Sequence, residues 1–155
     1  MELVQDVIRM RGSLDMILRG PQGEIVDQKR FNNLLVTAGR AWVLGQLNSV
    51  NIVTSLTISA MAIGSSTVAP TTGDTALGGE VTRKTIATFS TAGLTNNPPS
   101  WQAQVSYATN EGNTTLAEVG LFNSSANGTM LAHATFTSFV KATSNTLNIS
   151  YTISG

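Results

Sequence analysis

Few side chains in this 155-residue sequence could carry out nucleophilic or acid–base chemistry, because it contains one histidine and no cysteine. A serine or threonine nucleophile needs a base within hydrogen-bond reach, and His133 is the single histidine that could serve. It lies in the stretch TMLAHATF, on the strand face opposite Met130 and Phe136. We therefore interpret it as a surface or subunit-contact histidine, and we expect no enzymatic activity.

Carboxylates are the next candidates, because a pair of them at the right separation can hydrolyse glycosides. Glu80, Glu111 and Glu118 lie near predicted strand ends. Glu111 falls in the polar turn NEGN, whereas Glu118 in LAEVGLF has apolar neighbours and needs either a cation such as Arg83 or backbone donors. We predict an internal ion pair between Arg83 and Glu118. Asp74 is a lone acid in the loop TTGDTAL, where it is expected to cap a turn.

Cofactor and metal signatures are missing from the sequence. It has no GxSxG, GxxxxGK or GxGxxG motif, no cysteine ligands, and no loop in which aspartate and asparagine recur at calcium-binding spacing. We expect no cofactor and no metal.

Exposed aromatic residues with amides could bind a carbohydrate, and Trp101, Tyr107 and Gln104 share a region. Trp101 and Tyr107 lie on the apolar face of their strand, however, which favours core packing.

The charge of the chain is low and unevenly distributed. Charged residues make up 12% of the sequence and the net charge is zero, which argues against a nucleic-acid partner. No stretch is long and apolar enough to cross a membrane, and the first residues do not form a signal peptide. Residues 1–44 hold 11 of the 18 charges, while 20 of the 21 threonines follow residue 50. Low net charge favours association.

Alternating apolar and polar residues predict a protein built mainly from strands. Residues 13–31 have the pattern of a hairpin, and a short helix is expected at 38–47 with Thr37 as its cap. Further strands are predicted in NIVTSLTISAMAIG, VTRKTIATFS, WQAQVSYAT, LAEVGLFN, TMLAHATFTSF and TLNISYTIS, and the segments between them are rich in turn-forming residues. The expected fold is an antiparallel β-sandwich or jelly-roll-like barrel, with an amino-terminal arm and hairpin (1–36) and a sandwich body (37–155) in one compact domain.

Several segments of the sequence, in their order and spacing, resemble those of a known family. They are TAGRAWV (37–43), MAIGSSTVAPTTGDTALGGEVTRK (61–84), LAEVGLFNSSANGTMLAHATF (116–136) and the final TLNISYTIS, so that the region from residue 37 to the end takes part. The family comprises short bacteriophage virion proteins and the amino-terminal domains of tail-fibre and tail-collar proteins. The residues that carry the resemblance are Gly39, Arg40, Gly64, Asp74, Leu77, Glu80, Arg83, Glu118, Gly120, Leu121 and Phe122.

The resemblance implies a structural role in the virion without enzymatic activity. Because no shaft or receptor-binding tip follows the last strand, we favour a capsid decoration, or cement, protein that forms an oligomer, expected to be a trimer, on the capsid exterior and contacts the major capsid protein. Its expected contact residues are Leu3, Val7, Ile8, Arg9, Arg11 and His133. A tail-fibre or collar adaptor and a carbohydrate-binding sandwich module are the alternatives.

Overall fold

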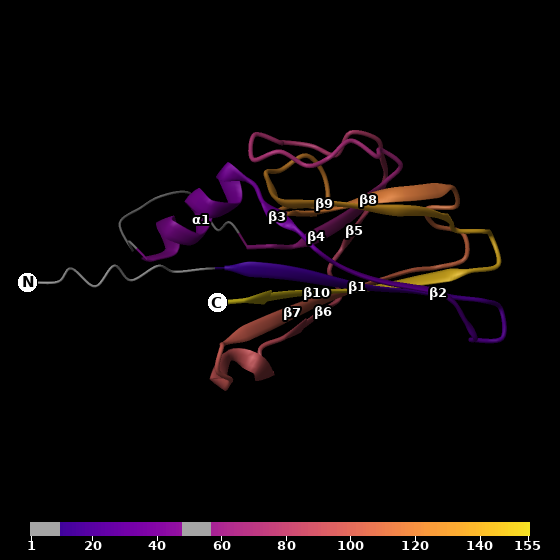
Figure 1. Ribbon diagram of the computed structural model, residues 1–155, viewed down its shortest axis with the longest axis horizontal. Helices are drawn as coiled ribbons and strands as arrows, with labels where there is room; N and C mark the ends of the chain where they lie inside the picture. The colour runs from indigo at the N-terminus through magenta and orange to yellow at the C-terminus, as the bar shows by residue number, and fades with distance from the viewer. Residues whose placement is uncertain (1–9, 48–56) are drawn as a thin grey trace, which may run out of the picture.

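The chain forms two five-stranded antiparallel sheets that face each other, as seen edge-on in the computed structural model of Figure 1. The structure describes residues 10–47 and 57–155. Sheet A has the strand order β2-β1-β10-β7-β6, and sheet B has the order β3-β9-β8-β4-β5. The predicted β-sandwich with one short helix is confirmed. The elements are β1 (Arg11–Arg19), β2 (Ile25–Asn32), β3 (Leu34–Leu35), α1 (Thr37–Leu47), β4 (Ala60–Gly64), β5 (Glu80–Thr85), β6 (Thr88–Ser90), the 3-10 helix η1 (Ala92–Thr95), β7 (Ser100–Tyr107), β8 (Thr115–Phe122), β9 (Met130–Val140) and β10 (Thr146–Ser154).

Sheet A includes the amino-terminal hairpin as an integral part. Strand β1 pairs with β10 from Arg11 opposite Ser154 to Arg19 opposite Thr146, and its other edge pairs with β2. The alternation predicted for β1, β7 and β10 places every second side chain in the space between the sheets. Residues 11–32 therefore belong to the sandwich, because their two strands complete one sheet.

Sheet B differs from sheet A because its central strands are covered on both faces. Strand β8 is buried from its second residue to its last, and β4 is buried throughout. One face packs against sheet A. The other face is covered by helix α1 and by the loop 65–79, which we call the strap; in Figure 1 the strap arches over the outer face of sheet B.

Two apolar clusters result from this layering. The larger cluster fills the space between the sheets and includes Leu14, Ile63, Val119 and Ile149. The smaller cluster lies beneath the strap on the outer face of sheet B and consists of Val36, Ala60, Ala62, Leu77, Phe122 and Met130. The alternation in TMLAHATF predicts Met130 on the same face as Ala132 and Ala134. Met130 lies instead in the smaller cluster, because a bulge between Leu121 and Phe122 shifts the register of the β8–β9 pair.

Helix α1 approaches strand β9 closely where Gly39 lies. A Cβ atom at Gly39 would be 2.1 Å from the backbone carbonyl oxygen of Leu131, so only glycine fits without a shift of the backbone. The same oxygen accepts a hydrogen bond from the amide of Val36, at 3.3 Å. The start of the helix is therefore fixed against sheet B.

Candidate functional site

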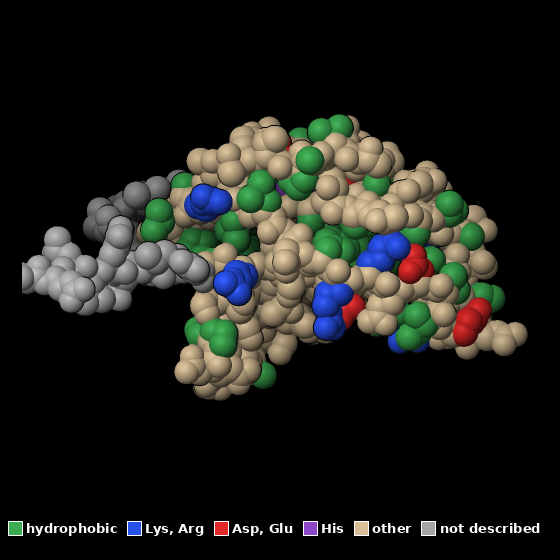
Figure 2. All heavy atoms as spheres, in the orientation of Figure 1, with side chains coloured by type: hydrophobic (Ala, Val, Ile, Leu, Met, Phe, Trp, Pro, Cys, Tyr) green, Lys and Arg blue, Asp and Glu red, His purple; other side chains and the backbone are tan. Residues whose placement is uncertain are grey.

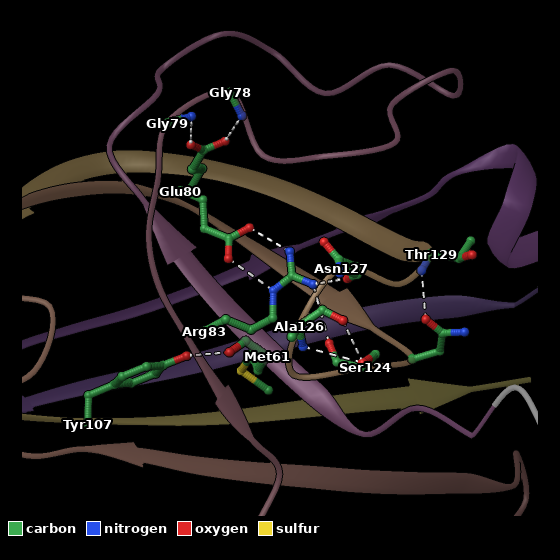
Figure 3. Close-up of polar contacts among 12 residues, drawn as sticks. Met61, Gly78, Gly79, Glu80, Arg83, Tyr107, Ser124, Ala126, Asn127 and Thr129 are labelled. Carbon is green, nitrogen blue, oxygen red and sulfur yellow. Dashed lines mark hydrogen bonds and ion pairs between the residues drawn. The ribbon is translucent and has the colours of Figure 1, made fainter.

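Glu118 is the most deeply buried charged residue of the described chain, with a relative exposure of 0%. Strand β8 directs its side chain to the outer face of sheet B. Its Oε1 atom accepts hydrogen bonds from the amides of Ser66, at 3.1 Å, and Gly79, at 2.7 Å. Its Oε2 atom accepts one from the amide of Gly78, at 3.0 Å. Figure 3 labels Gly78 and Gly79, and dashed lines run from their amides to a carboxylate. One side chain thus fastens both ends of the strap.

His133 continues this network from the adjacent strand. Strand β9 pairs with β8 so that His133 lies opposite Gly120, next to the pair formed by Glu118 and Thr135. Its Nε2 atom is 3.1 Å from Oε2 of Glu118, and its Nδ1 atom is 2.7 Å from Oδ2 of Asp74. The histidine is only 5% exposed, because the strap covers it. The interpretation of His133 as a surface or subunit-contact residue is therefore wrong.

Asp74 anchors the middle of the strap. Its carboxylate accepts hydrogen bonds from the hydroxyl of Thr71, at 2.6 Å, and from the amide of Thr71, at 2.8 Å, which confirms the predicted turn cap. These two bonds, together with the contact to His133, lower the pKa of Asp74 to about 2. Asp74 is therefore ionised at neutral pH, where its negative charge faces the histidine.

The network of Asp74, His133 and Glu118 is suited to holding a loop. The two ring nitrogens of His133 lie within hydrogen-bond distance of one carboxylate each, so the ring joins Asp74 of the strap to Glu118 of sheet B. The two carboxylates lie at opposite ring nitrogens, so their oxygens do not converge on one point where a metal could bind. Among the described residues no group of three or more histidine, aspartate or glutamate side chains has the arrangement of a metal site.

Arg83 has different partners from those that the sequence predicts. Its guanidinium forms a two-point contact with Glu80, with Nη2 to Oε2 at 2.6 Å and Nε to Oε1 at 3.0 Å. It also stacks on the Phe122 ring, 3.5 Å from the ring centre, and donates to the backbone carbonyls of Ser124 and Asn127. Figure 3 shows the contacts of Arg83 with Glu80, Ser124 and Asn127. The predicted Arg83–Glu118 ion pair is wrong: backbone amides and a histidine satisfy Glu118, and Glu80 neutralises Arg83.

The other residues that carry the family resemblance surround the same region. Gly64 lies directly under the strap, where a Cβ atom would be 2.6 Å from the carbonyl oxygen of Gly79. Leu77 and Phe122 are buried in the smaller cluster, while Leu121 is buried in the larger one. Gly120 leaves room for the side chains of Leu77 and Phe122. Arg40 is exposed on α1 and donates to the carbonyl oxygen of Leu35.

Of the expected capsid contact residues, Leu3, Val7, Ile8 and Arg9 lie outside the described residues. Arg11 is exposed at the start of β1. The expected core packing of Tyr107 is confirmed, since its side chain is buried and its hydroxyl donates to the carbonyl oxygen of Met61 at 2.7 Å. Trp101 is half-buried and packs against the larger cluster.

Two buried polar features were not found by reasoning from the sequence. One is the His133 network. The other is Lys141, which is 1% exposed and donates to the carbonyl oxygen of Ala108, at 2.7 Å, and to the side-chain oxygen of Asn113, at 2.8 Å. Burial lowers the pKa of Lys141. Its position directly after the long strand β9 was the available signal, since a lysine there can reach the turn between β7 and β8.

A corner of sheet A leaves apolar side chains uncovered. Phe89 of the edge strand β6 is paired with Ala103 of β7 and so lies on the core-facing side of the sheet, yet it is 48% exposed. Its ring centre is 6.3 Å from that of Trp101. Leu94 in η1 is 53% exposed. In Figure 2 hydrophobic atoms gather on the knob formed by η1 and the start of β7, whereas most of this face is neither charged nor hydrophobic.

Comparison of the chain with protein-family models, with curated proteins and with solved structures found no match in any of the three. Within residues 10–47 and 57–155 no helix is both long and apolar enough to span a membrane.

Proposed function

We propose that this chain is a non-enzymatic structural protein of a bacteriophage virion, and specifically a capsid decoration protein that forms a homo-oligomer on the outside of the shell. The observation that carries the proposal is the uncovered apolar corner at Phe89 and Leu94. It lies at β6, the outermost strand of sheet A in the described part of the chain, and a sheet edge with exposed apolar side chains is a ready surface for a second protein chain.

The buried network supports a structural role as well. Each polar side chain in it contacts another group of the protein, and its bonds fasten the strap to sheet B. The residues that resemble the virion family largely fall in this region, where they have packing and hydrogen-bonding roles. A rigid, weakly charged sandwich meets a neighbouring copy without the cost of desolvating many lysines and glutamates.

The copy number in the virion tests the proposal. A decoration protein is present in hundreds of copies per particle, whereas a tail-fibre or collar adaptor is present in a handful or a dozen. We expect quantitative gel densitometry of purified particles to give a ratio to the major capsid protein near that of a shell component. A ratio typical of a tail component would instead favour the adaptor, and absence of the chain from the particle would overturn both.

Purified protein and capsid shells that lack this chain are used to test whether the apolar corner is an interface. We expect Phe89→Asp to weaken self-association in light scattering and to reduce shell binding, because a buried carboxylate would have no partner at the interface. Val68→Asp is the matched control, since Val68 is an apolar strap residue that is 73% exposed and lies away from β6. If both variants bind shells like the parent chain, the corner is not the interface.

A deletion of residues 1–9, which keeps β1 intact, tests the predicted contribution of the amino-terminal arm.

A further inference from the structure

The outer face of sheet A has a polar groove with a volume of about 280 Å³, whose lining includes Ser13, Asp15, Arg30, Gln102, Asn148 and Ser150. Its shape follows from the strand register. The two central strands present short side chains, with Ser13 opposite Thr152 and Asp15 opposite Ser150. The flanking strands present long ones, Arg30 on β2 and Gln102 on β7. The short side chains of β1 and β10 form the floor of the groove, and the longer side chains of β2 and β7 form its walls.

Partners within the sheet orient the polar groups of the walls. Oδ2 of Asp15 accepts from Arg30, at 2.5 Å, and Oδ1 accepts from Gln28, at 3.1 Å. The hydrogen bond from Arg30 lowers the pKa of Asp15, so its carboxylate is ionised at neutral pH. Across the groove, Gln102 donates to the hydroxyl of Thr152, at 3.2 Å, and accepts from Gln104, at 2.7 Å. These side chains are held in place before any ligand arrives.

We propose that this groove binds a neutral carbohydrate. Its floor offers the hydroxyls of Ser13 and Ser150 and the amide of Asn148, groups that can each donate and accept a hydrogen bond, as the hydroxyls of a sugar do. The one carboxylate and the one guanidinium neutralise each other, so the groove as a whole carries no net charge. Ile17 supplies an apolar contact for the C–H face of a sugar ring.

Other ligand classes fit this groove less well. A phosphate or sulfate would meet the carboxylate of Asp15, and the one cation, Arg30, is already paired with it. A metal cation would meet that guanidinium. An apolar ligand would find only the side chain of Ile17, since that of Leu14 is buried between the sheets. The volume of about 280 Å³ is slightly below the roughly 300 Å³ at which small-molecule sites begin, and it suits one sugar unit of a longer chain.

The inference concerns a single copy of the chain and does not depend on the virion role. Its test is a titration of the ¹⁵N-labelled full-length protein with glucose, galactose, mannose and N-acetylglucosamine, with sialic acid as the charged comparator, followed by two-dimensional NMR. We expect at least one neutral sugar to shift the amide signals of Ser13, Asp15 and Ser150. If no neutral sugar shifts them, or if sialic acid binds best, the proposal is overturned, while the decoration role stays untouched.

Two variants and one matched control sharpen the result. Ser150→Leu fills the floor of the groove, and Asp15→Asn removes the ionised acceptor; each is expected to weaken binding at least tenfold. Ser106→Leu is the control, because Ser106 is exposed on the same face of β7 but does not line the groove. Binding that persists in both groove variants would overturn the proposal. A change of oligomeric state in Ser150→Leu, measured by analytical ultracentrifugation, would do so too, because it would identify the face as a contact between copies.

Discussion

The Nε2 atom of His133 lies 3.1 Å from Oε2 of Glu118, in a place where neither residue contacts solvent appreciably. The histidine comes from β9 and the glutamate from β8, and both side chains point away from the main core toward the strap. Burial of a carboxyl group is costly unless hydrogen-bond partners surround it, and here three backbone amides and an imidazole nitrogen do so. The strap is therefore fastened by electrostatic hydrogen bonds as well as by the packing of Leu77.

Replacing Glu118 by glutamine is expected to loosen the strap. The amide of glutamine keeps one acceptor but turns an NH₂ group toward backbone donors or the histidine, so at least one buried donor loses its partner. We expect the free energy of unfolding to fall by about 3 kcal/mol. Hydrogen exchange should accelerate at the amides of Ser66, Gly78 and Gly79. Glu24→Gln, in the exposed β1–β2 turn, is the control and should change stability by less than about 0.5 kcal/mol. Unchanged exchange in Glu118→Gln would show that the carboxylate does not hold the strap.

Acid should weaken the attachment of Asp74 within a defined pH range. Its pKa is about 2 in the folded protein and 3.8 in an ordinary environment, so the unfolded chain takes up the proton first as the pH falls. The stabilisation is present above about pH 4 and is lost as the pH falls toward 2. We expect the difference in unfolding free energy between the parent chain and Asp74→Asn to be constant above this range and to shrink within it. A difference that stays constant down to pH 2 would contradict the assignment.

Arg83 should not be replaceable by lysine. The guanidinium forms two contacts with Glu80 and stacks on Phe122, and a lysine ammonium cannot do both. We expect Arg83→Lys to lower the free energy of unfolding by about 1–2 kcal/mol. Arg40→Lys is the matched control, because Arg40 is exposed and has a single backbone bond. Equal denaturant midpoints for the two variants would show that the stacked geometry contributes nothing to stability.

The strands were predictable because alternation records which side chains face the core. Trp101, Ala103, Val105 and Tyr107 alternate with polar residues, and they occupy the core-facing side of β7. The segment LAEVGLF was different, since its apolar residues do not alternate with polar ones and Glu118 is the one charged residue among them. Such a run indicates a strand that is buried on both faces, and β8 is buried in this way.

The partners of the buried charges could not be predicted from the sequence. In the sequence, Glu118 and Arg83 both lie near apolar residues, and their opposite charges led to the prediction of an ion pair between them. The actual partners depend on the path of the strap, which brings the amides of Ser66, Gly78 and Gly79 to the carboxylate. Backbone amides have no signature in a sequence. The register of β8 against β9 is also shifted by bulges, and this register places His133 beneath the strap.

Replacing glycine by alanine is expected to have opposite effects on stability at two positions of helix α1. At Gly45 an added Cβ atom would meet nothing within 4 Å, so Gly45→Ala should stabilise the helix by about 0.5–1 kcal/mol through its higher helix propensity. At Gly39 the added atom would lie 2.1 Å from the carbonyl oxygen of Leu131, which belongs to the backbone of β9 and cannot rotate away. Gly39→Ala should therefore destabilise the protein by about 1–3 kcal/mol, because the helix must move off the sheet.

Urea denaturation of the two alanine variants beside the parent chain measures both effects, since the midpoint should rise for Gly45→Ala and fall for Gly39→Ala. Hydrogen exchange at the Val36 amide adds a local readout, because this amide donates to the same Leu131 oxygen and should exchange faster only in Gly39→Ala. If both variants shift the midpoint upward, propensity alone governs the helix, and the close approach of α1 to β9 does not exist in solution.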